Sequence, residues 1–167
     1  MQLSTEVIKK LREQTGAGIM DCKRALLEAG GDIPKALEIL EQRGLAIARK
    51  KAQRVAEQGI VEAYVHMGGR IGVLVEVNCE TDFVAHTDEF KELAHNIALQ
   101  IAAMSPQFVS QDDMPEEVDG EPEVLCLLSQ PFIKDPNKTI KNLIDETIAK
   151  VGENIKVRRF ARFEVGS

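Results

Sequence analysis

The chain has 167 residues, a formal net charge of -6 and only 4% aromatic residues, with no Trp. This acidity opposes generic binding to nucleic-acid backbones or anionic membranes, and the few aromatic rings offer no stacking platform for single-stranded nucleic acid. The three Cys are far apart and form no CxxC pair, which indicates neither a zinc site nor a disulfide framework. With no signal-peptide pattern and no long apolar stretch, the sequence is typical of a soluble cytoplasmic protein.

The first third of the chain predicts three short helices with apolar stripes. Ser4 or Thr5 can cap the first helix and Asp32 the third, and glycines suited to left-handed backbone follow the three helices, at Gly16, Gly30-Gly31 and Gly44. We therefore expect residues 1–44 to form a three-helix bundle, which is near the lower size limit for independent folding. Residues 45–58 are rich in Arg and Lys and predict a basic helical connector to the rest of the chain.

A different pattern begins at residue 59. Two strands are predicted over residues 60–67 and 70–79, and Gly68-Gly69 between them favours a tight hairpin turn. In the second strand, alternate residues are aliphatic, which indicates one strongly buried face. These residues are Ile71, Val73, Val75 and Val77.

Two amphipathic helices and a third strand complete the predicted core. The helices cover residues 90–104, where Ser105-Pro106 ends the pattern, and residues 139–151. Residues 155–165 predict the strand, and the acidic segment 107–123 is expected to be exposed. The predicted fold class is α+β: the helical bundle is followed by a core, residues 59–167, in which helices cover a small three-stranded antiparallel sheet.

No catalytic constellation is recognisable in the sequence. A thiol hydrolase needs a Cys and a His side by side, but Cys22 and Cys79 fall in different predicted domains and the three His are scattered. The sequence contains no GxSxG, HExxH or GxxxxGK[ST] motif. We predict no catalytic residues, no metal site and no cofactor, so the chain is not expected to be an enzyme.

Two short segments are candidates for partner binding. Thr81, Asp82, Phe83 and Val84 follow the most buried strand and precede the longest helix of the core. A Phe at such a corner either packs into its own core or is presented to a partner at a fixed height, and spacing alone leaves both interpretations open. Ile19 and Met20 follow the TGAG turn, where at least one of them is expected to point outward.

Three motifs resemble those of the elongation factor Ts family. They are TGAGIMDCKRAL at residues 15–26, EVNCETDFVA at residues 76–85, and KVGENIKVRRF at residues 150–160. Their order and spacing also match, so that the resemblance covers most of residues 3–165. It implies a ubiquitin-associated-like head and a guanine-nucleotide exchange factor that promotes GDP release from elongation factor Tu during protein biosynthesis.

The resemblance also implies which residues contact the partner. In the head, the residues at the family's contact with the GTPase domain of elongation factor Tu are Leu11, Ile19, Met20 and Lys23. In the core, Asp82 and Phe83 fall where the family inserts a wedge between helices of that GTPase domain. Thr81 and Val84 complete this loop.

The chain departs from the long members of the family, which carry two core subdomains and a coiled-coil insertion. It has room for one core subdomain, as in the short form, in which two copies pair; the resemblance therefore implies a homodimer. A plain adaptor protein with a helical binding head is the alternative function. Nucleic-acid binding through the basic residues 49–54 and through Arg158, Arg159 and Arg162 is less favoured, because the net charge opposes it and such charges are more simply a solvated face.

Overall fold

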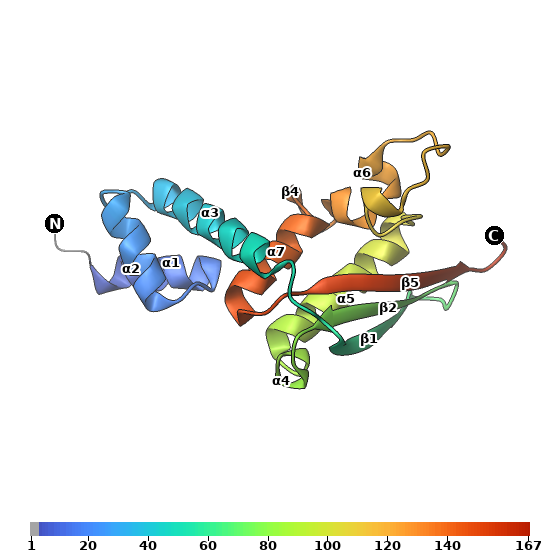
Figure 1. Ribbon diagram of the computed structural model, residues 1–167, viewed down its shortest axis with the longest axis horizontal. Coiled ribbons are helices and arrows are strands. Elements are labelled where there is room, and N and C mark those ends of the chain that lie inside the picture. Colours follow the sequence, from blue (N-terminus) through green and yellow to red (C-terminus); the bar gives the residue numbers. More distant parts are fainter. Residues whose placement is uncertain (1–3) are drawn as a thin grey trace.

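The computed structural model describes residues 4–167, and its first part is a helical head. The head consists of α1 (Thr5–Thr15), α2 (Ile19–Glu28) and α3 (Ile33–Lys51), and lies at one end of an elongated molecule (Figure 1). The side chains of Ser4 and Asp32 cap α1 and α3 by accepting hydrogen bonds from backbone N–H groups. Gly16 ends α1 in the left-handed conformation, as the sequence predicts.

The third helix does not end at Gly44, so this expectation was wrong. Helix α3 continues to Lys51, so residues 45–51 of the predicted basic connector form its last turns, and Gln58 at the end of that connector already begins a strand. A glycine inside a helix costs about 1 kcal/mol relative to Ala. Gly44 lies where α3 packs against α7, and a Cβ atom added to it would be 3.4 Å from the Cβ atom of Ala149, in ordinary van der Waals contact. Packing against α7 therefore overrides the local stop signal.

The core is built on a three-stranded antiparallel sheet with the order β1-β2-β5. Its strands are β1 (Gln58–Val65), β2 (Ile71–Cys79) and β5 (Lys156–Glu164). The turn between β1 and β2 contains Gly68 and Gly69, both with positive φ. The predicted α+β class, three helices followed by this sheet and its covering helices, is confirmed.

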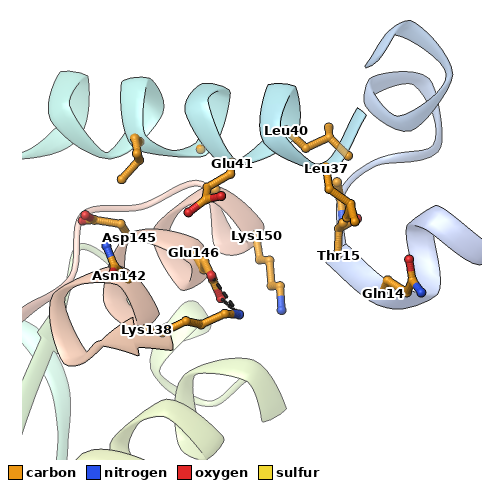
Figure 2. A pocket seen from close by; sticks show the side chains of 14 residues that line it. Gln14, Thr15, Leu37, Leu40, Glu41, Lys138, Asn142, Asp145, Glu146 and Lys150 are labelled. Atoms are coloured by element: carbon orange, nitrogen blue, oxygen red, sulfur yellow. Dashed lines mark hydrogen bonds and ion pairs between the residues drawn. The ribbon is translucent and has the colours of Figure 1, made fainter. Parts of the chain in front are cut away.

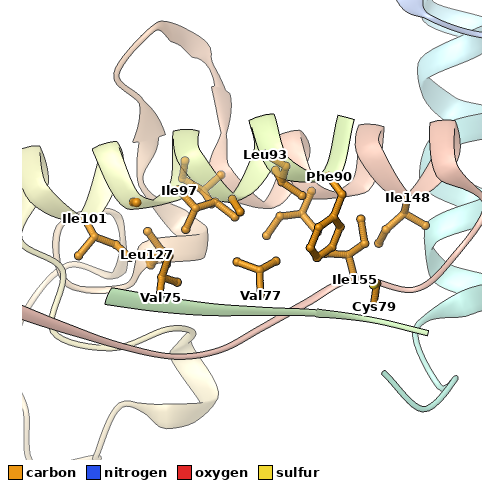
Figure 3. Close-up of a cluster of buried hydrophobic side chains, with 14 of the residues drawn as sticks. Val75, Val77, Cys79, Phe90, Leu93, Ile97, Ile101, Leu127, Ile148 and Ile155 are labelled. Atoms are coloured by element: carbon orange, nitrogen blue, oxygen red, sulfur yellow. The ribbon is translucent and has the colours of Figure 1, made fainter. Parts of the chain in front are cut away.

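Helix α5 (Asp88–Met104) covers one face of the sheet, and α7 (Ile140–Val151) packs against α5. Figure 3 shows how the predicted apolar face of β2 meets them: Val75 and Val77 point toward Phe90 and Ile97 of α5. Ile148 brings α7 into the same cluster. The alternating pattern of β2 and the helical patterns of α5 and α7 thus encode a single core.

The segment between α5 and α7 is mostly irregular and is held by two buried glutamines. Gln100 donates a hydrogen bond to the Oε1 atom of Gln130 (3.2 Å) and accepts one from the backbone N–H of Ile133 (2.9 Å). Gln130 in turn donates to the carbonyl of Val124 (2.8 Å). These hydrogen bonds hold the short helix α6 (Pro122–Leu125) and a hairpin formed by β3 (Pro131–Phe132) and β4 (Asp135–Thr139). The sequence did not predict this hairpin.

The opposite face of the sheet carries exposed apolar side chains. In β2, Leu74 points away from the core, and its neighbours in register are Ala63 of β1 and Ala161 of β5. This surface, here called the outer sheet face, consists of Val61, Ala63, Val65, Leu74, Ala161 and Phe163, all exposed. Among residues 4–167, no helix has the length and apolar character needed to cross a bilayer.

Candidate partner-binding site

A sharp corner joins β2 to α5, and part of it is a helix where a loop was expected. Helix α4 (Asp82–Ala85) is a single turn, and Thr81 caps it by accepting a hydrogen bond from the N–H of Val84 (3.3 Å). Thr87 then caps α5. We call residues 80–86 the α4 corner; Figure 1 shows it at the end of the core nearer the head.

Phe83 is presented by this corner and does not pack inside it. Its side chain is 82% exposed, whereas the next two residues, Val84 and Ala85, are buried in the core. Asp82 is exposed beside it. The buried pair anchors the helical turn, so that the aromatic ring stands on a fixed base; the inward-packing interpretation of Phe83 was wrong.

The base of the corner contains a buried thiol. The Sγ atom of Cys79 donates a hydrogen bond to the carbonyl of Thr81 (3.1 Å). Burial raises the pKa of Cys79 from its ordinary value of 9.0 to about 11, and the negative charges of Glu153 and Asp82 act in the same direction. The thiol therefore stays protonated at neutral pH and serves as a donor, not as a nucleophile.

Glu153, just after α7, binds Thr81, the residue that caps α4. Its carboxylate accepts hydrogen bonds from the backbone N–H of Thr81 (2.9 Å) and from the Thr81 hydroxyl (2.8 Å). The next residue, Asn154, donates its backbone N–H to the carboxylate of Glu80 (2.8 Å). Sequence reasoning noted the Gly-Glu-Asn stretch as part of a motif but gave these residues no role.

The head exposes a second apolar surface at the start of α2. Ile19 and Met20 are 52% and 60% exposed, and Lys23 lies exposed one turn along the helix. Leu27 continues this line at the helical spacing of i+7 from Met20 and is also exposed. Sequence reasoning missed Leu27, although its spacing from Met20 was available.

Two of the residues suggested by resemblance are buried. Leu11 is 1% exposed and belongs to the core of the head, with Cys22 and Leu26. Val84 is 5% exposed and belongs to the main core. In this structure neither side chain is available to a partner, and both instead support the surface residues above them.

The head and the core enclose a pocket of about 270 Å³ where α3 faces α7. Figure 2 shows Leu37 and Glu41 of α3 on one side and Lys150 of α7 on the other. Lys138 and Glu146 form an ion pair at its edge (2.9 Å). Its lining includes none of the α4 corner, so we place the candidate site on the two exposed surfaces.

The chemistry of both surfaces is that of binding. Within residues 4–167 there is no cluster of three or more His, Cys, Asp or Glu side chains that could hold a metal ion. The three Cys are all buried in the described part of the chain. What the surfaces offer is an exposed ring on an anchored turn and an apolar stripe on a helix, features that suit docking on another protein.

Comparison with known proteins gives a consistent result. The sequence matches the family model described as "Elongation factor TS" over residues 2–125 and again over residues 117–167. It is 54% identical to elongation factor Ts of Carboxydothermus hydrogenoformans, over 98% of this chain and 89% of the relative. It is 52% identical to elongation factor Ts of Thermotoga petrophila, over 99% of this chain and 98% of the relative.

The alignments also show that this chain is shortened internally. Each of the two alignments spans 194 positions, more than the 167 residues of the chain, so the relatives contain residues that have no counterpart here. The two family-model matches overlap at residues 117–125, at the end of the acidic segment. The α4 corner and the head lie outside this segment.

Proposed function

Because the chain belongs to the elongation factor Ts family, we propose that it acts on elongation factor Tu through the exposed ring of Phe83 and the apolar surface of α2. The chain is a translation elongation factor: a guanine-nucleotide exchange factor for elongation factor Tu, and not an enzyme. The assignment of residues to this activity is our proposal. We also propose that the protein acts in the cytoplasm.

The observation that carries the proposal is the contrast within α4. Phe83 is 82% exposed, yet the residues that follow it are buried in the core. An exposed aromatic ring on a rigid base is costly to leave in water and is well suited to fill a pocket on a partner. Asp82, exposed beside the ring, is placed to pair with a cation or a backbone N–H of that partner.

The ring acts by displacement of the nucleotide site. A GTPase holds its nucleotide through backbone N–H groups and a Mg²⁺ ion that requires near-ideal octahedral oxygen geometry. Phe83 entering between helices that support this site shifts them, and the nucleotide then loses affinity. By linkage, a factor that binds the nucleotide-free GTPase about a thousandfold better lowers GDP affinity by the same factor, which corresponds to about 4 kcal/mol.

The head supplies the second contact. Ile19, Met20 and Lys23 form its proposed docking surface, and Leu27 extends the apolar stripe. We propose a division of labour in which the head, formed by α1 to α3, recognises the partner and the core, residues 59–167, carries the exchange activity and pairing. The head binds the nucleotide-bound and the nucleotide-free GTPase equally well, whereas Phe83 makes binding to the nucleotide-free GTPase stronger.

The test is release of fluorescent GDP from elongation factor Tu. Catalytic amounts of the chain should accelerate release, and Phe83→Ala should remove most of the acceleration while the protein remains folded. Full acceleration by Phe83→Ala would refute the wedge. Tight binding without acceleration by the unmodified chain would instead support the adaptor alternative.

We also propose that two copies pair through the outer sheet face. This face has an apolar centre, where Leu74 is 51% exposed. Its edge carries both negative and positive charges, because the carboxylate of Glu76 pairs with Arg158 (3.4 Å) and Arg159 (2.8 Å). A two-fold interface must be self-complementary, and a patch with both charge signs meets this condition.

A further inference from the structure

We propose that Glu153 is a positioning residue for nucleotide exchange: its carboxylate fixes the orientation of the α4 corner, and thereby of the Phe83 ring. This inference rests on the function proposed above for Phe83. Glu153 does not itself touch the partner in this proposal. It acts through Thr81, the residue that begins the turn carrying the ring.

The contacts between Glu153 and Thr81 are bidentate. One carboxylate oxygen accepts the backbone N–H of Thr81 (2.9 Å), and the other accepts its hydroxyl (2.8 Å). The hydroxyl oxygen of Thr81 accepts the N–H of Val84 at the same time (3.3 Å). A carboxylate bonded to both the backbone and the side chain of a helix cap fixes the direction in which the helix starts, and hydrogen bonds to charged groups are the stronger ones.

The base that carries Glu153 is itself anchored. Gly152 turns the chain out of α7 with a φ of 76°. Asn154 is 2% exposed, and its amide donates to the carbonyl of Arg54 (2.7 Å) while its backbone N–H donates to Glu80 (2.8 Å). The turn after α7 thus contacts both the segment following α3 and the α4 corner. The Glu153 carboxylate connects this anchored turn to Thr81 by two hydrogen bonds.

Removal of this carboxylate should loosen the corner without unfolding it. Val84 and Ala85 remain buried, the Thr81 hydroxyl still caps α4, and Cys79 still donates to the carbonyl of Thr81. The folded corner then samples more orientations of Phe83. Exchange slows, because the ring reaches the inserted position in a smaller fraction of encounters.

The experiment is a double-mutant cycle in the GDP-release assay, with unmodified chain, Glu153→Ala, Phe83→Ala and the double variant. Glu153→Ala should lower the maximal release rate about tenfold, the effect of losing charge-assisted hydrogen bonds. The half-saturating concentration should change little, because the head surface is intact. In the Phe83→Ala background the same substitution should change the rate by less than about twofold, because no ring remains to be positioned.

Matched variants separate positioning from general damage. Glu146→Ala removes another half-buried carboxylate, in the middle of α7, that pairs with Lys138 (2.9 Å), and should leave the release rate unchanged. Glu153→Gln keeps one acceptor oxygen and should have an intermediate rate. Since the chain contains no Trp, Phe83→Trp gives a single fluorescent reporter, and its anisotropy should fall when Glu153→Ala is added but not when Glu146→Ala is added.

The outcomes distinguish this inference from the proposed function. Unchanged release by Phe83→Ala overturns the wedge and the positioning role together. A large loss in Phe83→Ala, combined with wild-type rates in Glu153→Ala and Glu153→Gln, overturns only the positioning role. An equal loss from Glu153→Ala in both backgrounds also overturns it, because the carboxylate would then act independently of the ring.

Discussion

Phe83 and Phe90 lie on consecutive helices at the end of β2, and only Phe90 is buried in the core. The ring of Phe90 is fully buried among the side chains of α5, α7 and β2, whereas that of Phe83 is 82% exposed. The two residues sit in consecutive helices, α4 and α5, each of which begins with a Thr cap. The ring carried by α5 is therefore part of the core, whereas the ring carried by α4 is available to a partner.

This contrast predicts opposite effects of the same substitution on stability. Phe90→Ala should lower the free energy of unfolding by about 3–5 kcal/mol, because it removes a buried ring and leaves a cavity. Phe83→Ala should change it by no more than about 0.5 kcal/mol, as is usual for an exposed site. Urea unfolding followed by circular dichroism measures both. A strongly destabilised Phe83→Ala would mean that the ring packs on its own chain.

The head surface should control affinity and not the maximal rate. Met20→Asp places a charge in the centre of the apolar stripe on α2, and burial of that charge against a partner is unfavourable. We expect the half-saturating concentration in the GDP-release assay to rise about tenfold or more, a change of roughly 1.4 kcal/mol, with the rate at saturation nearly unchanged.

The control for this variant is Met67→Asp, the same substitution in the β1–β2 turn, where Met67 is 89% exposed. Met67→Asp should leave both the half-saturating concentration and the rate at saturation unchanged. If Met20→Asp lowered the rate at saturation instead of the affinity, the head would take part in displacing the nucleotide, and the proposed division of labour between head and core would be wrong.

The elements that could be predicted from the sequence are those stabilised by a periodic apolar face. The alternation in β2 and the helical spacing in α5 and α7 reflect burial of one face against one core, which local sequence encodes. The capping of α1 and α3 was also predictable, because caps depend on neighbouring residues. The fold class followed from these elements.

The features that were missed depend on residues far apart in the chain. Helix α3 continues past Gly44 where it packs against α7, which lies about a hundred residues further along the chain. The β3–β4 hairpin depends on Gln100, which accepts a hydrogen bond from Ile133 across 33 positions. The bond between Thr81 and Glu153 spans 72 positions. No local pattern contains such pairs.

The outer sheet face predicts how pairing can be broken. Leu74→Asp introduces a charge at its centre, in a strand whose opposite face remains buried. We expect a folded protein with unchanged circular dichroism that sediments as a monomer, whereas the unmodified chain sediments as a dimer, since a buried unpaired carboxylate is disfavoured.

Val124→Asp is the matched control for pairing, because Val124 is similarly exposed, at 57%, in α6, outside the sheet. It should leave the dimer intact. A monomeric unmodified chain at micromolar concentration would contradict the pairing proposal, and a Leu74→Asp variant that remains dimeric would place the interface elsewhere.

The thiol beneath the α4 corner predicts how stability depends on alkaline pH. The pKa of Cys79 is about 11 in the folded protein and 9.0 ordinarily. Between these values the unfolded chain releases the proton that the folded protein retains, so rising pH favours unfolding. The contribution of Cys79 to the free energy of unfolding is therefore complete below pH 9.0 and is lost progressively as the pH rises toward about 11.

The test compares the unmodified chain with Cys79→Ala, which removes this titration while the other two Cys stay in place. The difference in unfolding free energy between the two proteins should narrow as the pH rises from 9.0 to about 11. A constant difference would mean that the thiol ionises equally well in the folded corner, and hence that neither burial nor the carboxylate of Glu153 acts on it as the structure indicates.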